Sequence, residues 1–294
     1  MDLAIHNWMK VEPLEVAVAR LAKYGYKRIE IQGEPYKYDT TEVKALLDKY
    51  GVSCWGSVTL MLEERNLLTK DDAQRANSVQ YVKDCITMVA ELGGKVMSIV
   101  PGTVGKLVPD ATPEEEWGWA VETMKDIYAH SEPLGVRLAI EPINRFETYF
   151  INRGDQALAL AEAVGPNCGI CLDVFHMNIE EADTFAMLER AGDRLANFHV
   201  ADNNRMAPGM GDFDWPKLID AVKATGYDGA LSVEFSPPVD RTPANPHPDA
   251  IDTNPEGISE SERKFLEDHG SNVISAAFYD RLVKQSADVL LPLL

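Results

Sequence analysis

The chain has 294 residues, 45% of them hydrophobic and 26% charged, which is typical of a globular protein with a large core. Its 28 basic and 47 acidic residues give a net charge of -19. Such a charge repels nucleic acid backbones and anionic lipid, so neither is expected as a partner. The sequence has no run of about 18 apolar residues and begins without a secretory signal pattern, so we expect a cytoplasmic protein.

Short apolar stretches alternate with longer amphipathic ones along the chain. Strands are predicted at 3–6, 27–32, 52–58, 95–100, 136–141, 169–174, 194–200 and 229–235. Helices are predicted at 13–24, 40–50, 71–92, 113–134, 153–164, 180–191, 214–225 and after the last strand. Within the helices, apolar residues recur every three or four positions, as at Val79, Val82 and Ile86. Thr112 and Asp214 are typical N-cap residues for two of them.

Eight strand–helix units in series predict a parallel sheet, and eight is the number that closes a barrel. An open doubly wound sheet is the alternative, but it usually carries a glycine fingerprint after its first strand, and "AIHNWMKVEP" has none. We therefore predict an α/β fold, a single (β/α)8 TIM barrel domain over 1–294. In 236–258, six of 23 residues are proline, which predicts a long loop after strand eight, on the active-site face of the barrel.

Four cysteines are present, and two of them form the pattern "CGIC". A metal or redox pair is one interpretation of this pattern. Residues three apart on a strand, however, point to opposite faces of the sheet. The sequence therefore favours reduced thiols in the core, at Cys54, Cys85, Cys168 and Cys171.

Four consecutive predicted strands each end near one side chain of the kind that binds metals. These side chains are Glu141, Asp173, His199 and Glu234. Taken singly, such a glutamate is usually an ion-pair partner and such a histidine a hydrogen-bonded core residue. Together, at one mouth of a closed barrel, three carboxylates would repel one another without a cation between them. Their donor atoms favour Mn²⁺, with Mg²⁺ or Co²⁺ as alternatives.

Three further residues follow the predicted metal ligands by a few positions. Glu147, His176 and Arg205 are each expected in a loop that leaves a metal strand, where they could bind the hydroxyl groups of a sugar. The simpler interpretation makes Glu147 a partner of Arg145 and leaves Arg205 as a surface cation. Glu180 and its neighbour at 181 are expected in the first turn of the helix predicted at 180–191, where negative charge suits the helix dipole.

The segments "EPINRFETYFINR", "LDVFHMNIEE", "HVADNNRMAPGMGDFDW" and "VEF" resemble the sugar isomerase/epimerase TIM-barrel superfamily, the xylose isomerase-like barrels, and in particular ketose 3-epimerases of the D-tagatose/D-allulose type. The resemblance covers about 1–235. It implies a metal, commonly Mn²⁺, bound by Glu141, Asp173, His199 and Glu234. It also implies that the two glutamates move protons as acid and base. Residues matching Glu147, His176 and Arg205 contact the sugar in that family.

The expected function is therefore a metal-dependent epimerase or isomerase of a ketose or keto-sugar. It would remove a proton next to the carbonyl group and pass through an enediolate. After "VEF" the resemblance ends, so a lyase that cleaves 3-keto-glycosides, as in C-glycoside deglycosidases, is the alternative. A homo-oligomer is expected, or a smaller unlike subunit if the protein is a lyase. His247 could reach the site from the proline-rich loop, although a solvated position is the simpler interpretation.

An endonuclease of the same superfamily would need more histidine ligands and a basic surface, which the charge of -19 contradicts. A barrel that only binds its ligand has no need for two glutamates on a metal. The expected partner is therefore a small-molecule sugar substrate, which the long loop after strand eight would allow to be larger than a free ketohexose.

Overall fold

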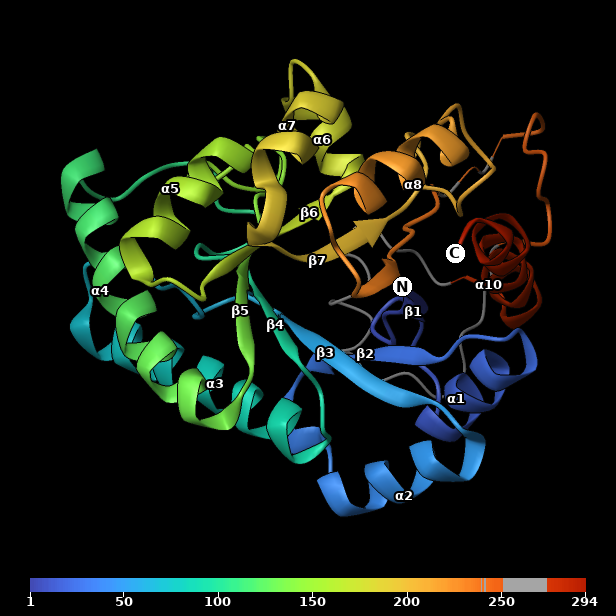
Figure 1. Cartoon of the computed structure of the whole chain (residues 1–294), viewed down its shortest axis with the longest axis horizontal. Coiled ribbons are helices and arrows are strands. Elements are labelled where there is room, and N and C mark those ends of the chain that lie inside the picture. Colours follow the sequence, from blue (N-terminus) through green and yellow to red (C-terminus); the bar gives the residue numbers. More distant parts are fainter. Residues whose placement is uncertain (239, 241, 251–273) are drawn as a thin grey trace.

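The computed structural model describes residues 1–238, 240, 242–250 and 274–294. Within them, eight parallel strands form one sheet in the order β1-β8-β7-β6-β5-β4-β3-β2 (Figure 1). The strands are β1 Asp2–Ile5, β2 Arg28–Gly33, β3 Ser53–Thr59, β4 Val96–Ile99, β5 Arg137–Ile140, β6 Gly169–Asp173, β7 Leu195–Val200 and β8 Ala230–Val233. A bridge between His6 and Glu30 joins the two edge strands and closes the barrel. The predicted TIM barrel is confirmed.

Helices surround the strands on the outside of the barrel (Figure 1). They are α1 Leu14–Lys23, α2 Thr40–Tyr50, α3 Asp72–Glu91, α4 Pro113–Ser131, α5 Gly154–Val164, α6 Val174–Glu180, α7 Thr184–Ala191, α8 Trp215–Ala224 and α10 Ala276–Leu290. Thr112 and Asp214 cap α4 and α8 as predicted, and Thr112 forms a capping box with Glu115. Polar side chains thus satisfy the free amides at these helix starts.

The helix predicted at 180–191 begins later, at Thr184, and a further helix that was not predicted, α6, precedes it; an aspartate begins each of them. Asp173 caps α6 by accepting from the backbone amide of Phe175 at 2.8 Å. Asp183 accepts from the first amides of α7. Glu180 therefore ends α6 instead of beginning a helix, and the predicted dipole role is wrong. Its carboxylate binds the exposed Arg145 side chain instead.

The barrel strands are buried on both faces where helices cover them, as in β6 and β7, every residue of which is buried. All four cysteines are buried and free, as predicted. Burial raises the pKa of the Cys54 and Cys168 thiols to about 12, so they stay protonated at neutral pH. Among the residues described, no helix is both long and apolar enough to cross a membrane.

The described part of the loop after β8 is held at both ends. At its start, the backbone amide of Ser236 donates to the carbonyl oxygen of Arg205 at 2.8 Å. Toward its other end, the His247 ring packs on Phe278 of α10, with 5.0 Å between ring centroids. His247 therefore contacts the outer helix layer. Residues 239, 241 and 251–258 of the predicted loop lie outside the described residues.

Candidate active site

The carboxyl ends of β5 to β8 bring the four predicted metal ligands together. Asp173 is the last residue of β6 and pairs in register with His199 of β7. Glu141 directly follows β5, and its amide donates to the carbonyl oxygen of Ile99. Glu234 directly follows β8, and its amide donates to the carbonyl oxygen of Val200. Continuing ladder bonds thus set all four side chains at one depth.

Their polar atoms converge on His199. The imidazole Nδ1 lies 2.9 Å from Oε1 of Glu141 and 3.3 Å from Oε2 of Glu234. Glu141, Asp173 and His176 offer ligand atoms within 4.8 Å of one another. All five side chains are buried, with at most 5% of any residue exposed. A compact, buried group of carboxylates and imidazoles is the arrangement that protein metal sites use.

Asp173 has one oxygen committed to the fold and one free. Its Oδ1 caps α6, while Oδ2 is buried without a hydrogen-bond partner, 3.6 Å from Nε2 of His176. Burial, together with Glu234 and Glu141, raises the pKa of Asp173 to about 7. An unpartnered carboxylate oxygen in a buried site is costly, and a cation ligand would remove that cost. The donor set therefore fits a divalent metal ion.

Charge within the cluster is uneven. Burial, together with Glu234 and Glu30, raises the pKa of Glu141, although His199 lowers it. Burial also acts to raise the pKa of Glu234, but His6 and His199 hold it well below its ordinary value. Burial lowers the pKa of His199, yet the surrounding groups raise it well above the usual range. The carboxylates therefore draw positive charge to this end of the barrel.

Cys171 lies closer to the cluster than the sequence indicated. Its sulfur and the ligand atoms of Glu141 and His199 lie within 4.8 Å of one another. Burial raises the pKa of this thiol far above its ordinary value, so it stays protonated and is a weak metal ligand. Oxygen and imidazole donors therefore dominate the site, and they suit the harder divalent ions.

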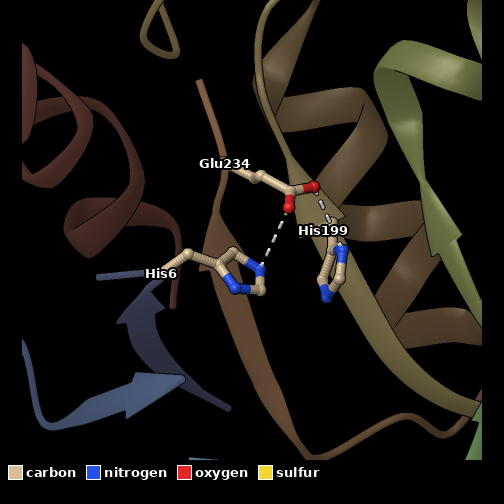
Figure 2. Close-up of side chains that lie close together, drawn as sticks. All are labelled: His6, His199 and Glu234. Carbon is tan, nitrogen blue, oxygen red and sulfur yellow. Dashed lines mark ion pairs between the residues drawn. The ribbon is translucent and has the colours of Figure 1, made fainter. Parts of the chain in front are cut away.

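His6 belongs to the cluster although sequence reasoning did not select it (Figure 2). Its Nε2 lies 3.8 Å from Oε1 of Glu234, and its ring meets the His199 ring edge to face, with centroids 4.5 Å apart. Both ring nitrogens are buried without a hydrogen-bond partner. The signal was available, because His6 ends the first predicted strand as the selected residues end theirs. His6 was not selected because the first strand is not among the four consecutive strands, five to eight, that carry the predicted ligands.

A layer of polar side chains lies deeper in the barrel and was also missed. Glu30 of β2 is completely buried and accepts hydrogen bonds from Asn197 and Ser232. Burial acts to raise its pKa, but His6 and His199 lower the pKa of Glu30 to about 2, so it is ionised. The signal was a single acid between two apolar residues in "KRIEIQ". Such an acid on a buried strand calls for a buried partner.

The three predicted substrate contacts lie on one side of the cluster. Arg205 donates from Nη1 to Oε1 of Glu147 at 3.1 Å, and the side-chain amide Nδ2 of Asn144 donates to the same oxygen at 2.7 Å. The His176 Nδ1 accepts from the Asn144 backbone amide at 3.2 Å, so the His176 Nε2 carries the proton of the neutral ring. His176 lies on α6, whereas the prediction placed it in a loop.

The Arg205 side chain is only 16% exposed and, as a partner of Glu147, is not a free surface cation. Its guanidinium covers the Phe175 ring, 4.5 Å from the centroid, and its Nε is buried without a hydrogen-bond partner. Its backbone has a φ of 58°, a left-handed conformation that costs a non-glycine residue about 1–2 kcal/mol. Its amide donates to the carbonyl oxygen of Asp202 at 2.8 Å. A strained, partly buried arginine with an unused donor is a feature of binding sites.

The chain is similar to several known sugar epimerases. The chain is 28% identical over 232 residues to D-psicose 3-epimerase of Ruminiclostridium cellulolyticum, covering 74% of this chain and 76% of that one. It is 27% identical over 229 residues to 3-dehydro-D-guloside 4-epimerase of Escherichia coli, covering 73% and 84%. D-allulose 3-epimerase from Methylomonas sp., solved in complex with D-allulose, superposes with a TM-score of 0.83 at 23% identity, covering 100% and 97%.

The model of one protein family, described as the xylose isomerase-like TIM barrel, matches residues 18–275. That match includes β2 to β8 and every residue of the cluster except His6. The chain belongs to the xylose isomerase-like TIM barrel family.

Proposed function

We propose that this protein is a divalent-metal-dependent epimerase that inverts a hydroxyl-bearing carbon next to the carbonyl group of a ketose or keto-sugar. The main support is one observation: Glu141 and Glu234 approach His199 from different strands, beside an unpartnered oxygen of Asp173. Relatives named as 3-epimerases and a 4-epimerase of sugars support the substrate class.

Glu141, Asp173, His199 and Glu234 would hold the metal, for which Mn²⁺ is the proposed ion and Mg²⁺ or Co²⁺ are compatible. When bound, the ion would act as a Lewis acid that stabilises the negative charge formed on the substrate oxygens as the proton leaves. The four buried side chains would also keep water out of the reaction, which strengthens every charge interaction there.

Glu141 and Glu234 would move the protons. They stand at the ends of β5 and β8, with β6 and β7 between them in the sheet order. A substrate carbon held between the two would lose its proton to one carboxylate and receive a proton from the other on the opposite face. Delivery to the opposite face inverts the configuration. The Trp8 indole N–H donates to Oε1 of Glu234 at 3.1 Å and would hold that carboxylate in place.

Arg205, Glu147 and His176 would orient the sugar. The Arg205 Nε and the His176 Nε2 are donors, and Glu147 supplies an acceptor. The Glu147 to Arg205 pair holds both side chains in one geometry. Such orientation matters because small displacements at the reacting carbon lower the rate strongly.

A second candidate uses the same proton abstraction. If the substrate were a 3-keto-glycoside, expulsion of the group beta to the carbanion would make the protein a lyase. Similarity to the relative named for 3-dehydro-D-guloside favours a keto-glycoside as one class to test. The homo-oligomer stays a prediction, as does the unlike small subunit of the lyase alternative.

The test is a panel of ketoses and 3-keto-glycosides incubated with the Mn²⁺-loaded protein in D₂O, with products identified by NMR. An epimerase gives an inverted carbon that carries solvent deuterium. A lyase releases the aglycone. If no substrate in the panel exchanges a proton or changes configuration, the proposed epimerase is wrong.

A further inference from the structure

Glu30 lies below the proposed metal ligands and has one oxygen that the fold does not use. Its Oε1 accepts from Nδ2 of Asn197 at 2.7 Å and from the Ser232 hydroxyl. Its Oε2 is buried and has no hydrogen-bond partner. That oxygen lies 3.5 Å from Nε2 of His199 and 3.8 Å from Nδ1 of His6. A buried carboxylate oxygen therefore faces the side of His199 that points away from the metal ligands.

The neighbouring amide of Asn197 has a determined orientation. Its Oδ1 accepts from Nε1 of Trp55 at 2.9 Å and from the backbone amide of Phe198 at 3.0 Å. Because both partners are N–H groups, the carbonyl oxygen must face them and the NH₂ group must face inward. Its Nδ2 also lies 3.0 Å from Nε2 of His199, but both amide hydrogens have acceptors, one in Glu30 at 2.7 Å and one in Ser98 at 3.0 Å. This NH₂ group cannot accept a proton from His199.

The two ring nitrogens of His199 therefore face different groups and need different protonation. Nδ1 faces Glu141 and Glu234, so a metal held there needs the lone pair of Nδ1. The ring proton of the metal-binding tautomer must stand on Nε2, where it needs an acceptor. We propose that Glu30 is a positioning residue that accepts this proton through Oε2 and so fixes His199 in its metal-binding tautomer and orientation.

The inference rests on the proposed function only in taking His199 as a metal ligand. Glu30 lies beneath His199 in the barrel and is assigned no contact with the substrate. Its effect would therefore be seen first in metal affinity and only through that in turnover. This makes the inference testable without any knowledge of the sugar.

Glu30→Gln is the informative variant, because it keeps the shape of the side chain. Asn197 and Ser232 donate to one oxygen, so the glutamine carbonyl would keep that place. The new NH₂ group would then face Nε2 of His199 and favour a proton on Nδ1, which blocks metal binding. Loss of such an orienting partner typically weakens metal affinity about 10- to 100-fold. Calorimetric titration of EDTA-treated protein with Mn²⁺ measures it.

Glu116→Gln is the matched control. Glu116 is also buried, and its Oε1 accepts from the Tyr149 hydroxyl at 2.7 Å and from the Asp110 amide at 3.1 Å. It shares the cost of changing a buried carboxylate but none of the contacts to His199, so its Mn²⁺ affinity should equal that of the wild type. Glu30→Asp keeps the negative charge and should lose less affinity than Glu30→Gln.

A spectroscopic measurement on the wild type makes the result independent of whether the variants fold. In the Mg²⁺-loaded protein, ¹⁵N NMR of the His199 ring should show the proton on Nε2. A proton on Nδ1, or wild-type Mn²⁺ affinity in folded Glu30→Gln, would overturn the role of Glu30. A wild type that binds no divalent ion would overturn the metal site and this role together. A metal-binding wild type that epimerises no sugar would leave Glu30 in place and remove only the proposed activity.

Discussion

Arg205 and Glu147 are 58 positions apart in the chain, yet Nη1 of one lies 3.1 Å from Oε1 of the other. The pair joins the loop after β7 to the loop after β5 beside the candidate metal ligands. Burial acts to raise the pKa of Glu147, but Arg205 and His176 lower it below its ordinary value, so the carboxylate is ionised. Because Arg205 keeps an unpartnered Nε, the pair holds a donor ready for a ligand.

We expect Arg205→Ala to raise KM and lower kcat together, since Arg205 would orient the sugar at the reacting carbon. Steady-state kinetics on the substrate found by the panel measures both constants. Arg145→Ala is the control, because the exposed Arg145 side chain binds Glu180. An unchanged kcat/KM in Arg205→Ala would remove this residue from the site.

Asp173→Asn and His199→Ala should each reduce metal occupancy. The first removes the charge of the unpartnered Oδ2, and the second removes the imidazole on which the two glutamates converge. Elemental analysis after loading with Mn²⁺ and desalting gives the occupancy. Full occupancy in both variants contradicts the proposed ligand set.

Glu234→Gln should lose turnover by about 10²–10⁴-fold, the usual cost of removing a general acid or base. The amide keeps an oxygen to accept from the Trp8 indole but cannot take a proton from carbon. Metal content measured on the same sample separates lost proton transfer from lost metal. Near-native turnover with full metal content would mean that Glu234 moves no proton.

The stability of the metal-free protein should depend on pH through Asp173. Burial raises the pKa of this group from 3.8 to about 7, so the folded chain keeps a proton there that the unfolded chain has already lost. Its contribution to stability is complete below pH 3.8 and is lost as pH rises through 7. The difference in unfolding midpoint between Asp173→Asn and the wild type, followed in EDTA from pH 5 to 8, should therefore change in favour of the variant. A constant difference would contradict the raised pKa.

The segment 236–258 is predicted to set the size of the substrate or to meet another subunit. It begins at the amide of Ser236, which binds the backbone of Arg205. Replacing 238–256 with a short Gly/Ser linker should leave the metal bound, because the four ligands lie outside the replaced segment. It should change substrate preference or the mass in solution. Identical rates on every substrate and an unchanged mass would show that the segment has neither role.

Local sequence patterns were enough to predict the barrel and to place the four proposed metal ligands at strand ends. The alternation of strand and helix patterns can be recognised from neighbouring residues. An apolar run of about six residues is enough to show that a strand ends in Asp173 or Glu141. Parallel strands then place such ends at one mouth, whatever the details of the helices. The N-caps at Thr112 and Asp214 were visible for the same reason, since a cap acts on amides two or three residues away.

Contacts across the barrel depended on tertiary structure. His6 and Glu30 reach the site only because the edge strands β1 and β2 meet and close the barrel, which brings them beside His199 of β7. The spacing of these residues along the sequence does not show that they come close to His199. Closure and strand register are set by the packing of the whole core, so they decide which buried groups meet.

The loops show the same limit. Glu147 could pair with Arg145 because the two are close in the sequence. In the folded chain, however, Arg145 forms an ion pair with Glu180, and Glu147 forms one with Arg205. An exposed neighbouring pair contributes little free energy, whereas the partial burial of Arg205 favours a partner for its charge. The sequence by itself determined which residue types stand at the strand ends. Only the tertiary structure decided their partners, because desolvation makes a buried charge depend on whatever the fold brings within reach.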